Sequence, residues 1–266
     1  GTAAIPNTYA GIGVFTDGGF HTIGGTNAAA RNVISGNFGP GIWLGSGTFS
    51  NTIAGNFIGL ASNGLVIVSN TWSGIEITDA PRNIIGPGNV IAGNLGPGIN
   101  VYGTGSVGNL IIGNLVGLGS NGTTPLGISW AGIGLSYGSS NTTVGGTNAT
   151  ARNIVSGNGS SGVDLYESSH NNILGNFIGT SRSGTPLTSN SQDGILLNLS
   201  THNRIGGTAP GSANLLSGNN TAIYLYQASD FNVIEGNLIG TTSNGLAALP
   251  NATGIIVDLQ SASNTI

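Results

Sequence analysis

The sequence repeats itself, and this feature constrains the fold more than any other. A Gly-Ile pair recurs at intervals of 63, 58, 62 and 60 residues, with Gly11, Gly74, Gly132, Gly194 and Gly254 as its first members. Similar pairs fall between them, starting at Gly41, Gly98, Gly162 and Ala222. We therefore interpret residues 1–266 as one repetitive domain. It has four double units that start near residues 11, 74, 132 and 194, and a partial fifth from residue 254.

Each turn of the repeat carries three apolar signatures in a fixed order. The first is Gly-Ile-x-apolar (residues 41–44), the second Asn-x-apolar (51–53), and the third Asn, two apolar residues and a small one (56–59). Apolar residues that alternate with small or polar ones are typical of half-buried strands. Three such strands per turn, separated by Gly, Asn and Ser, predict a triangular coil, and stacked coils bury a continuous core.

The Asn of the third signature predicts a structural ladder. Stacked amides can hydrogen-bond to the coils above and below, as in cross-β arrays, whereas stacked carboxylates would repel. The Asn residues expected in this ladder are Asn32, Asn56, Asn89, Asn114, Asn153, Asn176, Asn214 and Asn237.

Composition excludes several classes of protein. Only 5% of the residues are charged, Lys, Cys and Met are absent, and the net charge is −4. The best surface helix formers are thus missing, which argues against an α-helical fold. Five scattered Arg give no nucleic-acid footprint, and no apolar run approaches the ~20 residues that span a bilayer. We expect no nucleic-acid partner and no membrane insertion. Since 38% of the residues are hydrophobic, the chain is not disordered.

Two strings carry a family resemblance: Asn-Val-Ile-Ser-Gly-Asn at residues 32–37 and Asn-Phe-Ile-Gly-Thr at residues 176–180. They resemble the right-handed parallel β-helix repeats of pectate-lyase-like proteins, and more closely the repeat arrays of large secreted or surface-exposed bacterial and archaeal proteins. The resemblance implies an all-β, right-handed parallel β-helix of about eight coils. We expect three short strands per coil and a long loop on alternate coils.

The resemblance does not extend to catalytic motifs. Polysaccharide-cleaving members of the superfamily carry strings such as Asn-Thr-Asp, Asp-Asp and Gly-His-Gly, and none of these occurs here. No catalytic residue is therefore carried over, and the sequence predicts a protein that is not an enzyme. The three His residues are interpreted as corner residues in separate coils, so no metal site is assigned to them.

One candidate contact surface is the outer face of the sheet formed by the first signatures. Three Tyr should recur there on alternate coils, ~9.6 Å apart, with further aromatic and acidic residues beside them. The candidate residues are Trp43, Tyr102, Asp164, Tyr166, Tyr224 and Tyr226. They could stack on sugar rings or pack against another rod, or they could be ordinary surface packing.

The same face collects six of the nine acidic residues: Asp17, Glu76, Asp79, Asp164, Glu167 and Asp258. Glu76 with Asp79, or Asp164 with Glu167, could share a cation, so weak calcium binding is one interpretation and solubilising charge is the other. No other cofactor is expected. We also expect no pair of glycosidase carboxyls, because Glu76 and Asp164 should lie three coils, ~14 Å, apart.

Four loops of about 14 residues recur at one corner, over residues 60–73, 118–131, 180–193 and 241–253. They could form a ridge that binds a ligand. We favour a flap that covers one sheet and packs through the leucines Leu65, Leu126, Leu187 and Leu246.

From these features the leading hypothesis is a non-enzymatic structural solenoid outside the cell or on its surface, as a segment of a fibre, filament, stalk or adhesin. Neither end of the sequence carries a recognisable polar cap, which favours self-association, end to end or lateral. The alternative is a module that binds or cleaves polysaccharide, which makes polysaccharide the second candidate partner.

Overall fold

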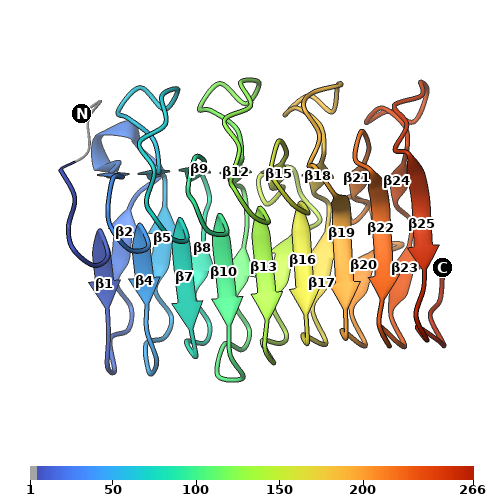
Figure 1. The fold of residues 1–266 in the computed structure, drawn as a ribbon, viewed down its shortest axis with the longest axis horizontal. Coiled ribbons are helices and arrows are strands. Elements are labelled where there is room, and N and C mark those ends of the chain that lie inside the picture. Colours follow the sequence, from blue (N-terminus) through green and yellow to red (C-terminus); the bar gives the residue numbers. More distant parts are fainter. Residues whose placement is uncertain (1–4) are drawn as a thin grey trace.

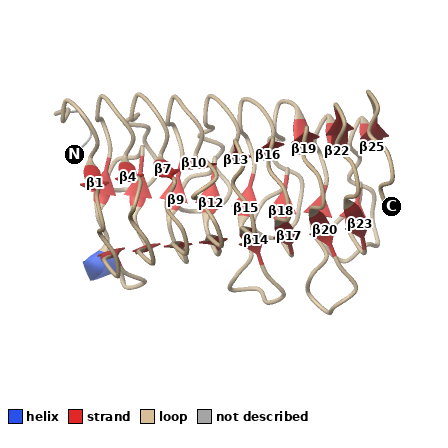
Figure 2. Ribbon diagram, turned by 90° about the horizontal axis from the view of Figure 1, so that it is seen from below, coloured by secondary structure: helices blue, strands red, loops and turns tan. Residues whose placement is uncertain are grey.

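The computed structural model describes residues 5–266, and over this range the chain is a parallel β-helix. The coils stack along one axis from the N-terminal to the C-terminal end (Figures 1 and 2). Three sheets of nine, eight and eight strands run along the stack, and neighbouring strands in each sheet are parallel. The predicted all-β fold with three short strands per coil is confirmed.

The first sheet is built from the strands of the Gly-Ile signature. Its strands are β1 (Ile12–Val14), β4 (Ile42–Leu44), β7 (Ile75–Thr78), β10 (Ile99–Tyr102), β13 (Ile133–Ser136), β16 (Val163–Tyr166), β19 (Asp193–Asn198), β22 (Thr221–Tyr226) and β25 (Thr253–Val257).

The other two sheets hold the second and third strands of each coil. The second sheet contains β2 (Thr22–Gly24), β5 (Thr52–Ala54), β8 (Ile84–Ile85), β11 (Leu110–Ile111), β14 (Thr143–Gly145), β17 (Asn172–Leu174), β20 (Arg204–Gly206) and β23 (Val233–Glu235). The third sheet contains β3 (Val33–Ile34), β6 (Phe57–Ile58), β9 (Val90–Ile91), β12 (Leu115–Val116), β15 (Ile154–Val155), β18 (Phe177–Ile178), β21 (Leu215–Leu216) and β24 (Leu238–Ile239). A short 3₁₀ helix, η1 (Ala28–Ala30), precedes β3. Across residues 5–266, no helix has the length and apolar character needed to cross a membrane.

The main core lies inside the coil, where each sheet contributes inward-facing Ile, Leu and Val. In the first sheet, Ile75, Ile99 and Ile133 pair in register and are fully buried. A second apolar cluster covers the outer face of the third sheet, and Leu126 and Leu187 of the long loops pack against it. The predicted flap thus forms in the two middle loops. Leu65 and Leu246 are instead exposed, at 40% and 86%.

The eight predicted ladder Asn residues hydrogen-bond in chain order. From Asn32 to Asn214, each Nδ2 donates to the Oδ1 of the next residue along the stack, at 2.9–3.2 Å. Asn51 bonds to Asn83 in the same way at the start of the second strands, and Asn37 bonds to Asn70 at the corner before the first strands. Buried polar side chains therefore satisfy one another from coil to coil.

Candidate active site in a groove of the first sheet

The outward-facing side chains of the first sheet form the floor of a groove. The strand register aligns Trp43, Glu76, Asn100, Gly134 and Asp164 in one row that crosses five neighbouring strands, β4 to β16. Because the strands are spaced ~4.8 Å apart, Glu76 and Asp164 lie about 14 Å apart along the row. Gly134 has no side chain to fill the space between them, so the floor dips at its centre.

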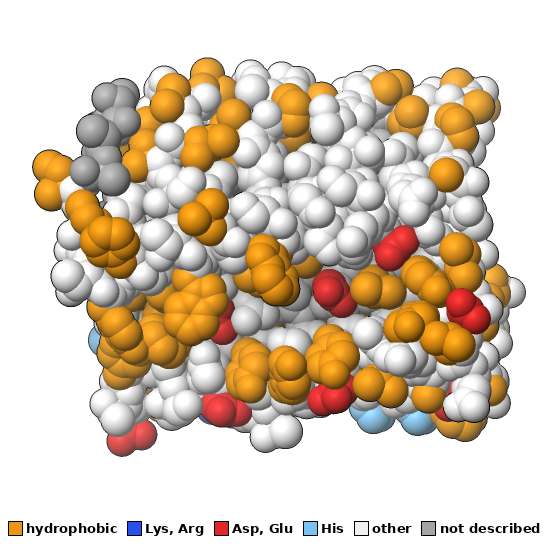
Figure 3. Space-filling view, in the orientation of Figure 1, with side chains coloured by type: hydrophobic (Ala, Val, Ile, Leu, Met, Phe, Trp, Pro, Cys, Tyr) orange, Lys and Arg blue, Asp and Glu red, His pale blue; other side chains and the backbone are white. Residues whose placement is uncertain are grey.

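Aromatic side chains line both walls of the groove. Trp72 and Trp130 end two of the long loops and lie on the wall at the loop corner. On the opposite wall, Tyr137 lies between Tyr102 and Tyr166, with ring centroids 4.9 and 5.1 Å away. The hollow between the walls has a volume of about 760 Å³, within the usual range of ligand pockets. Figure 3 shows hydrophobic side chains gathered around this hollow, with acidic side chains among them.

The predicted contact residues divide between two adjoining hollows. Trp43, Tyr102, Asp164 and Tyr166 line the main groove. A second hollow of about 410 Å³ continues along the same sheet towards β25, and its lining includes Asp193. Its predicted contact residues are Tyr224 and Tyr226. Both hollows share Leu196 and Asn198, so the surface is one extended groove.

Four residues that line the groove are not among the predicted contact residues. Trp72 and Trp130 belong to the predicted long loops, Glu76 was predicted as a solubilising or cation-sharing acid of this face, and Tyr137 was not predicted. Tyr137 follows the last residue of β13 and adopts a left-handed backbone conformation, with φ of 51°. This turn brings its ring into the gap that the alternate-coil spacing of Tyr102 and Tyr166 leaves open.

Glu76 is a buried carboxyl in the floor of the groove. It is only 5% exposed. The Ser73 hydroxyl donates to its Oε2 at 2.7 Å and Asn100 Nδ2 donates to its Oε1 at 2.8 Å. These hydrogen bonds favour the charged form, but burial outweighs them and raises the pKa of Glu76 to about 7. A carboxyl with this pKa can both give and accept a proton near neutral pH.

Asp164 is also shifted towards its neutral form. Burial, with a smaller contribution from the charge of Asp193, raises the pKa of Asp164 to about 6. Burial likewise raises the pKa of Asp193, against a hydrogen bond from Thr221. The floor of the groove is therefore acidic and poorly solvated.

Glu76 and Asp79, one of the two acid pairs that could share calcium, make separate hydrogen bonds in the structure. Glu76 binds Ser73 and Asn100, whereas the Oδ1 of Asp79 accepts the backbone N–H of Gly105 at 2.9 Å. Residues 5–266 contain no group of three or more His, Cys, Asp or Glu side chains arranged to hold a metal ion. Weak calcium binding stays a prediction.

The coils and the groove describe a parallel β-helix, and solved structures share this fold. The periplasmic alginate epimerase AlgG aligns with a TM-score of 0.54 and 15% identity over 89% of this chain and 51% of AlgG. The A-module of the mannuronan C-5 epimerase AlgE6 of Azotobacter vinelandii aligns with a TM-score of 0.49 and 16% identity, over 99% of this chain and 77% of the module. The chain thus spans about half the length of AlgG. No curated protein matches at the sequence level.

The family model named NosD, periplasmic copper-binding protein, matches residues 117–266, which is more than half of the chain. The chain therefore belongs to the NosD family of parallel β-helix proteins, and the resemblance to right-handed β-helix repeats is confirmed.

The copper named in the family description does not fit the residues present here. Copper sites in proteins are built from imidazole and sulfur ligands, and this chain has three His and neither Cys nor Met. Two of the histidines, His170 and His202, stack with ring centroids 5.1 Å apart and planes within 6°. Because the nitrogen lone pairs lie in the two parallel ring planes and cannot converge on one point, the two side chains cannot bind one ion in this arrangement.

The comparisons also correct the prediction that the chain is not an enzyme. Solved structures that share its fold include enzymes that modify polysaccharide, such as the alginate epimerase AlgG. The prediction relied on the absence of known catalytic motifs from the sequence. Such motifs cannot reveal a carboxyl whose pKa is raised by burial in the folded chain. The fibre role expected from the repeats gains no support from the comparisons.

Proposed function

We propose that the chain is a polysaccharide-active β-helix module that binds a glycan in the groove of the first sheet. The observation that carries the proposal is the buried Glu76, with its raised pKa, in the floor of an aromatic-lined hollow of about 760 Å³. Aromatic faces offer large, rigid contact area at low entropic cost. The alginate epimerases of the same fold support polysaccharide as the ligand class.

In this proposal Glu76 transfers the proton. Its two hydrogen-bond partners, Ser73 and Asn100, fix the orientation of the carboxyl. The lining aromatic side chains position the sugar rings. Hydrolysis by a pair of carboxyls is disfavoured, because Asp164 lies about 14 Å along the row and paired glycosidase carboxyls lie within about 10 Å. The floor instead supplies a single carboxyl, Glu76, whose pKa of about 7 lets it give or accept the proton.

The proposed site of action lies outside the cytoplasm. The family is named for a periplasmic protein, and AlgG is described as periplasmic. Polysaccharide is the proposed partner.

The experiment is incubation of the protein with a panel of neutral and acidic polysaccharides, followed by assays for reducing ends, unsaturated products and changed sugar configuration. We expect Glu76→Gln to lower kcat at least about 100-fold, as loss of a general acid or base does. The matched control is Glu235→Gln, a carboxyl on β23 in the second sheet that pairs with Arg204, and it should leave activity unchanged.

Binding is tested separately from chemistry. The double variant Tyr102→Ala/Tyr166→Ala should weaken glycan binding at least about tenfold, because it removes two aromatic walls of the groove. No product and no binding across the whole panel would contradict the proposed function, and unchanged binding in the double variant would place the glycan elsewhere.

A further inference from the structure

We infer that the groove selects an uncharged polysaccharide, lying along the axis of the rod, and rejects polyuronates such as the alginate of the structural neighbours. This inference rests on the proposed function and deepens it. The evidence for it is the distribution of charge around the two hollows, which, among residues 5–266, are lined by acidic side chains and by no arginine or histidine.

The acidic groups lie on the floor of the groove and along its continuation. Glu76 and Asp164 line the main hollow, and Asp193 lines the second. Asp258 lies beside the second hollow, where its Oδ2 accepts the hydroxyl of Tyr224 at 3.1 Å. A polyuronate carries a carboxylate on every sugar, and like charges in a poorly solvated site repel strongly.

No positive side chain offsets these acids, because no arginine or histidine lines either hollow in the described chain. Arg31 and Arg152 lie over the rings of Phe57 and Phe177 on the third sheet. Arg82 lies 5.9 Å from the ring of Phe49. A binding site for a polyanion would need such cations in the groove.

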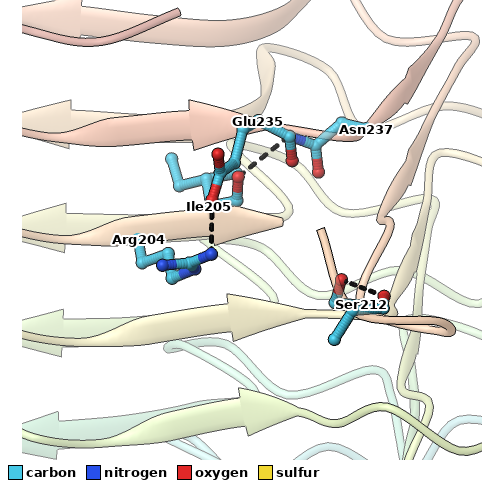
Figure 4. Close-up of polar contacts among 6 residues, drawn as sticks. Arg204, Ile205, Ser212, Glu235 and Asn237 are labelled. Atoms are coloured by element: carbon cyan, nitrogen blue, oxygen red, sulfur yellow. Dashed lines mark hydrogen bonds and ion pairs between the residues drawn. The ribbon is translucent and has the colours of Figure 1, made fainter. Parts of the chain in front are cut away.

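The remaining two arginines are also engaged away from the groove. Arg182 packs against Gly122 between two long loops. Arg204 on β20 pairs with Glu235 on β23 in the second sheet, as Figure 4 shows. The chain contains five Arg and no Lys, so every cationic side chain with a fixed positive charge is accounted for outside the groove.

Apart from these acids, the polar groups that line the groove are neutral. They include Thr71, Asn100, Ser136, Ser160, Gln192 and Asn198. Amides and hydroxyls donate and accept hydrogen bonds without net charge, which matches the hydroxyls of a neutral sugar. The three Trp and the Tyr rings complement the apolar faces of such sugars.

The test measures binding of length-matched oligosaccharides to the unmodified protein by titration calorimetry. The neutral probes are gluco-, manno- and xylo-oligosaccharides, and the acidic probes are oligomannuronate, oligoguluronate and oligogalacturonate. Measurements at pH 8 keep Glu76 and Asp164 largely ionised, with EDTA in one arm and calcium in the other. We expect the tightest neutral probe to bind with a Kd at least about tenfold lower than every acidic probe.

The ratio of the Kd of the acidic probes to the Kd of the tightest neutral probe measures the selectivity. The variant Asp164→Asn should lower this ratio by raising the affinity for the acidic probes. The matched control Asp230→Asn removes a carboxylate that accepts the backbone N–H of Ala262 outside the groove, and it should leave the ratio unchanged. Tighter binding of an acidic probe than of any neutral probe, in either arm, overturns the inference while the proposed function survives. If neither kind of probe binds, the proposed function fails and the inference fails with it.

Discussion

At the scale of single residues, Glu76 illustrates a conflict between stability and chemistry. Its pKa is raised to about 7 from an ordinary value of 4.5 by burial, so the folded state binds more protons than the unfolded state between these pH values. Its contribution to stability therefore falls as the pH rises from about 4.5 through 7, and the penalty is complete above pH 7. A pKa change of this size corresponds to about 3 kcal/mol.

Glu76→Gln removes the ionisable group and should abolish this penalty. We expect the variant to be more stable than the parent at pH 8 by up to about 3 kcal/mol, and to differ much less at pH 4.5. Urea unfolding at the two pH values measures the difference, with Glu235→Gln, a partly exposed carboxyl of the second sheet, as the control. An equal change in unfolding free energy at both pH values would argue against a buried, proton-binding Glu76.

At the scale of strands and ladders, most of the fold could be predicted from the sequence. The ladder Asn and the inward Ile recur because every coil repeats the same corner and the same core position, so repetition alone reveals them. Where the Asn repeat is interrupted, a buried polar atom loses its hydrogen-bond partner. Asn158 follows Asn94 in the corner ladder, but Ile128 occupies the position between them, and the buried Oδ1 of Asn158 has no hydrogen-bond partner in the described chain.

The groove could be predicted only in part, because it depends on neighbours that are far apart in the sequence. The register of the strands could be extrapolated, and it correctly aligned Tyr102 with Tyr166 on alternate strands. The return path of the long loops could not be extrapolated. This path places the ring centroid of Trp72 6.0 Å from that of Trp43. Burial, which sets the pKa of Glu76, likewise follows from packing and leaves no mark in the sequence.

Gly134 provides a prediction at the level of the strand. A Cβ at this position would meet Asn100 Oδ1 at 3.0 Å, a flexible side chain that can shift slightly, and the Ile99 carbonyl oxygen at 3.9 Å. β-branched residues favour strands over glycine by about 1 kcal/mol. We therefore expect Gly134→Val to unfold at equal or higher denaturant concentration than the parent, yet to bind glycan at least about tenfold more weakly because the side chain fills the dip in the floor. Chemical unfolding and calorimetry test the two parts. Retained affinity would mean that the glycan does not contact the floor between Glu76 and Asp164.

At the scale of the whole molecule, the solenoid gathers onto one face residues that the chain spreads over many coils. All three Trp of the sequence, Trp43, Trp72 and Trp130, line the main hollow. A rod made of near-identical coils has many equivalent surfaces, so the concentration of every Trp on one of them marks this face as different from the other two.

Because all three Trp line the groove, the tryptophan fluorescence of the protein responds to changes in the groove. In the free protein Trp72 and Trp130 are 51% and 63% exposed, and a glycan that covers their rings should shift the emission to shorter wavelength and protect it from acrylamide quenching. The change should saturate with the same Kd as calorimetry, and a monosaccharide at equal mass concentration is the control for bulk solvent effects. Saturable binding by calorimetry with unchanged emission and unchanged quenching would show that the ligand occupies another face of the rod.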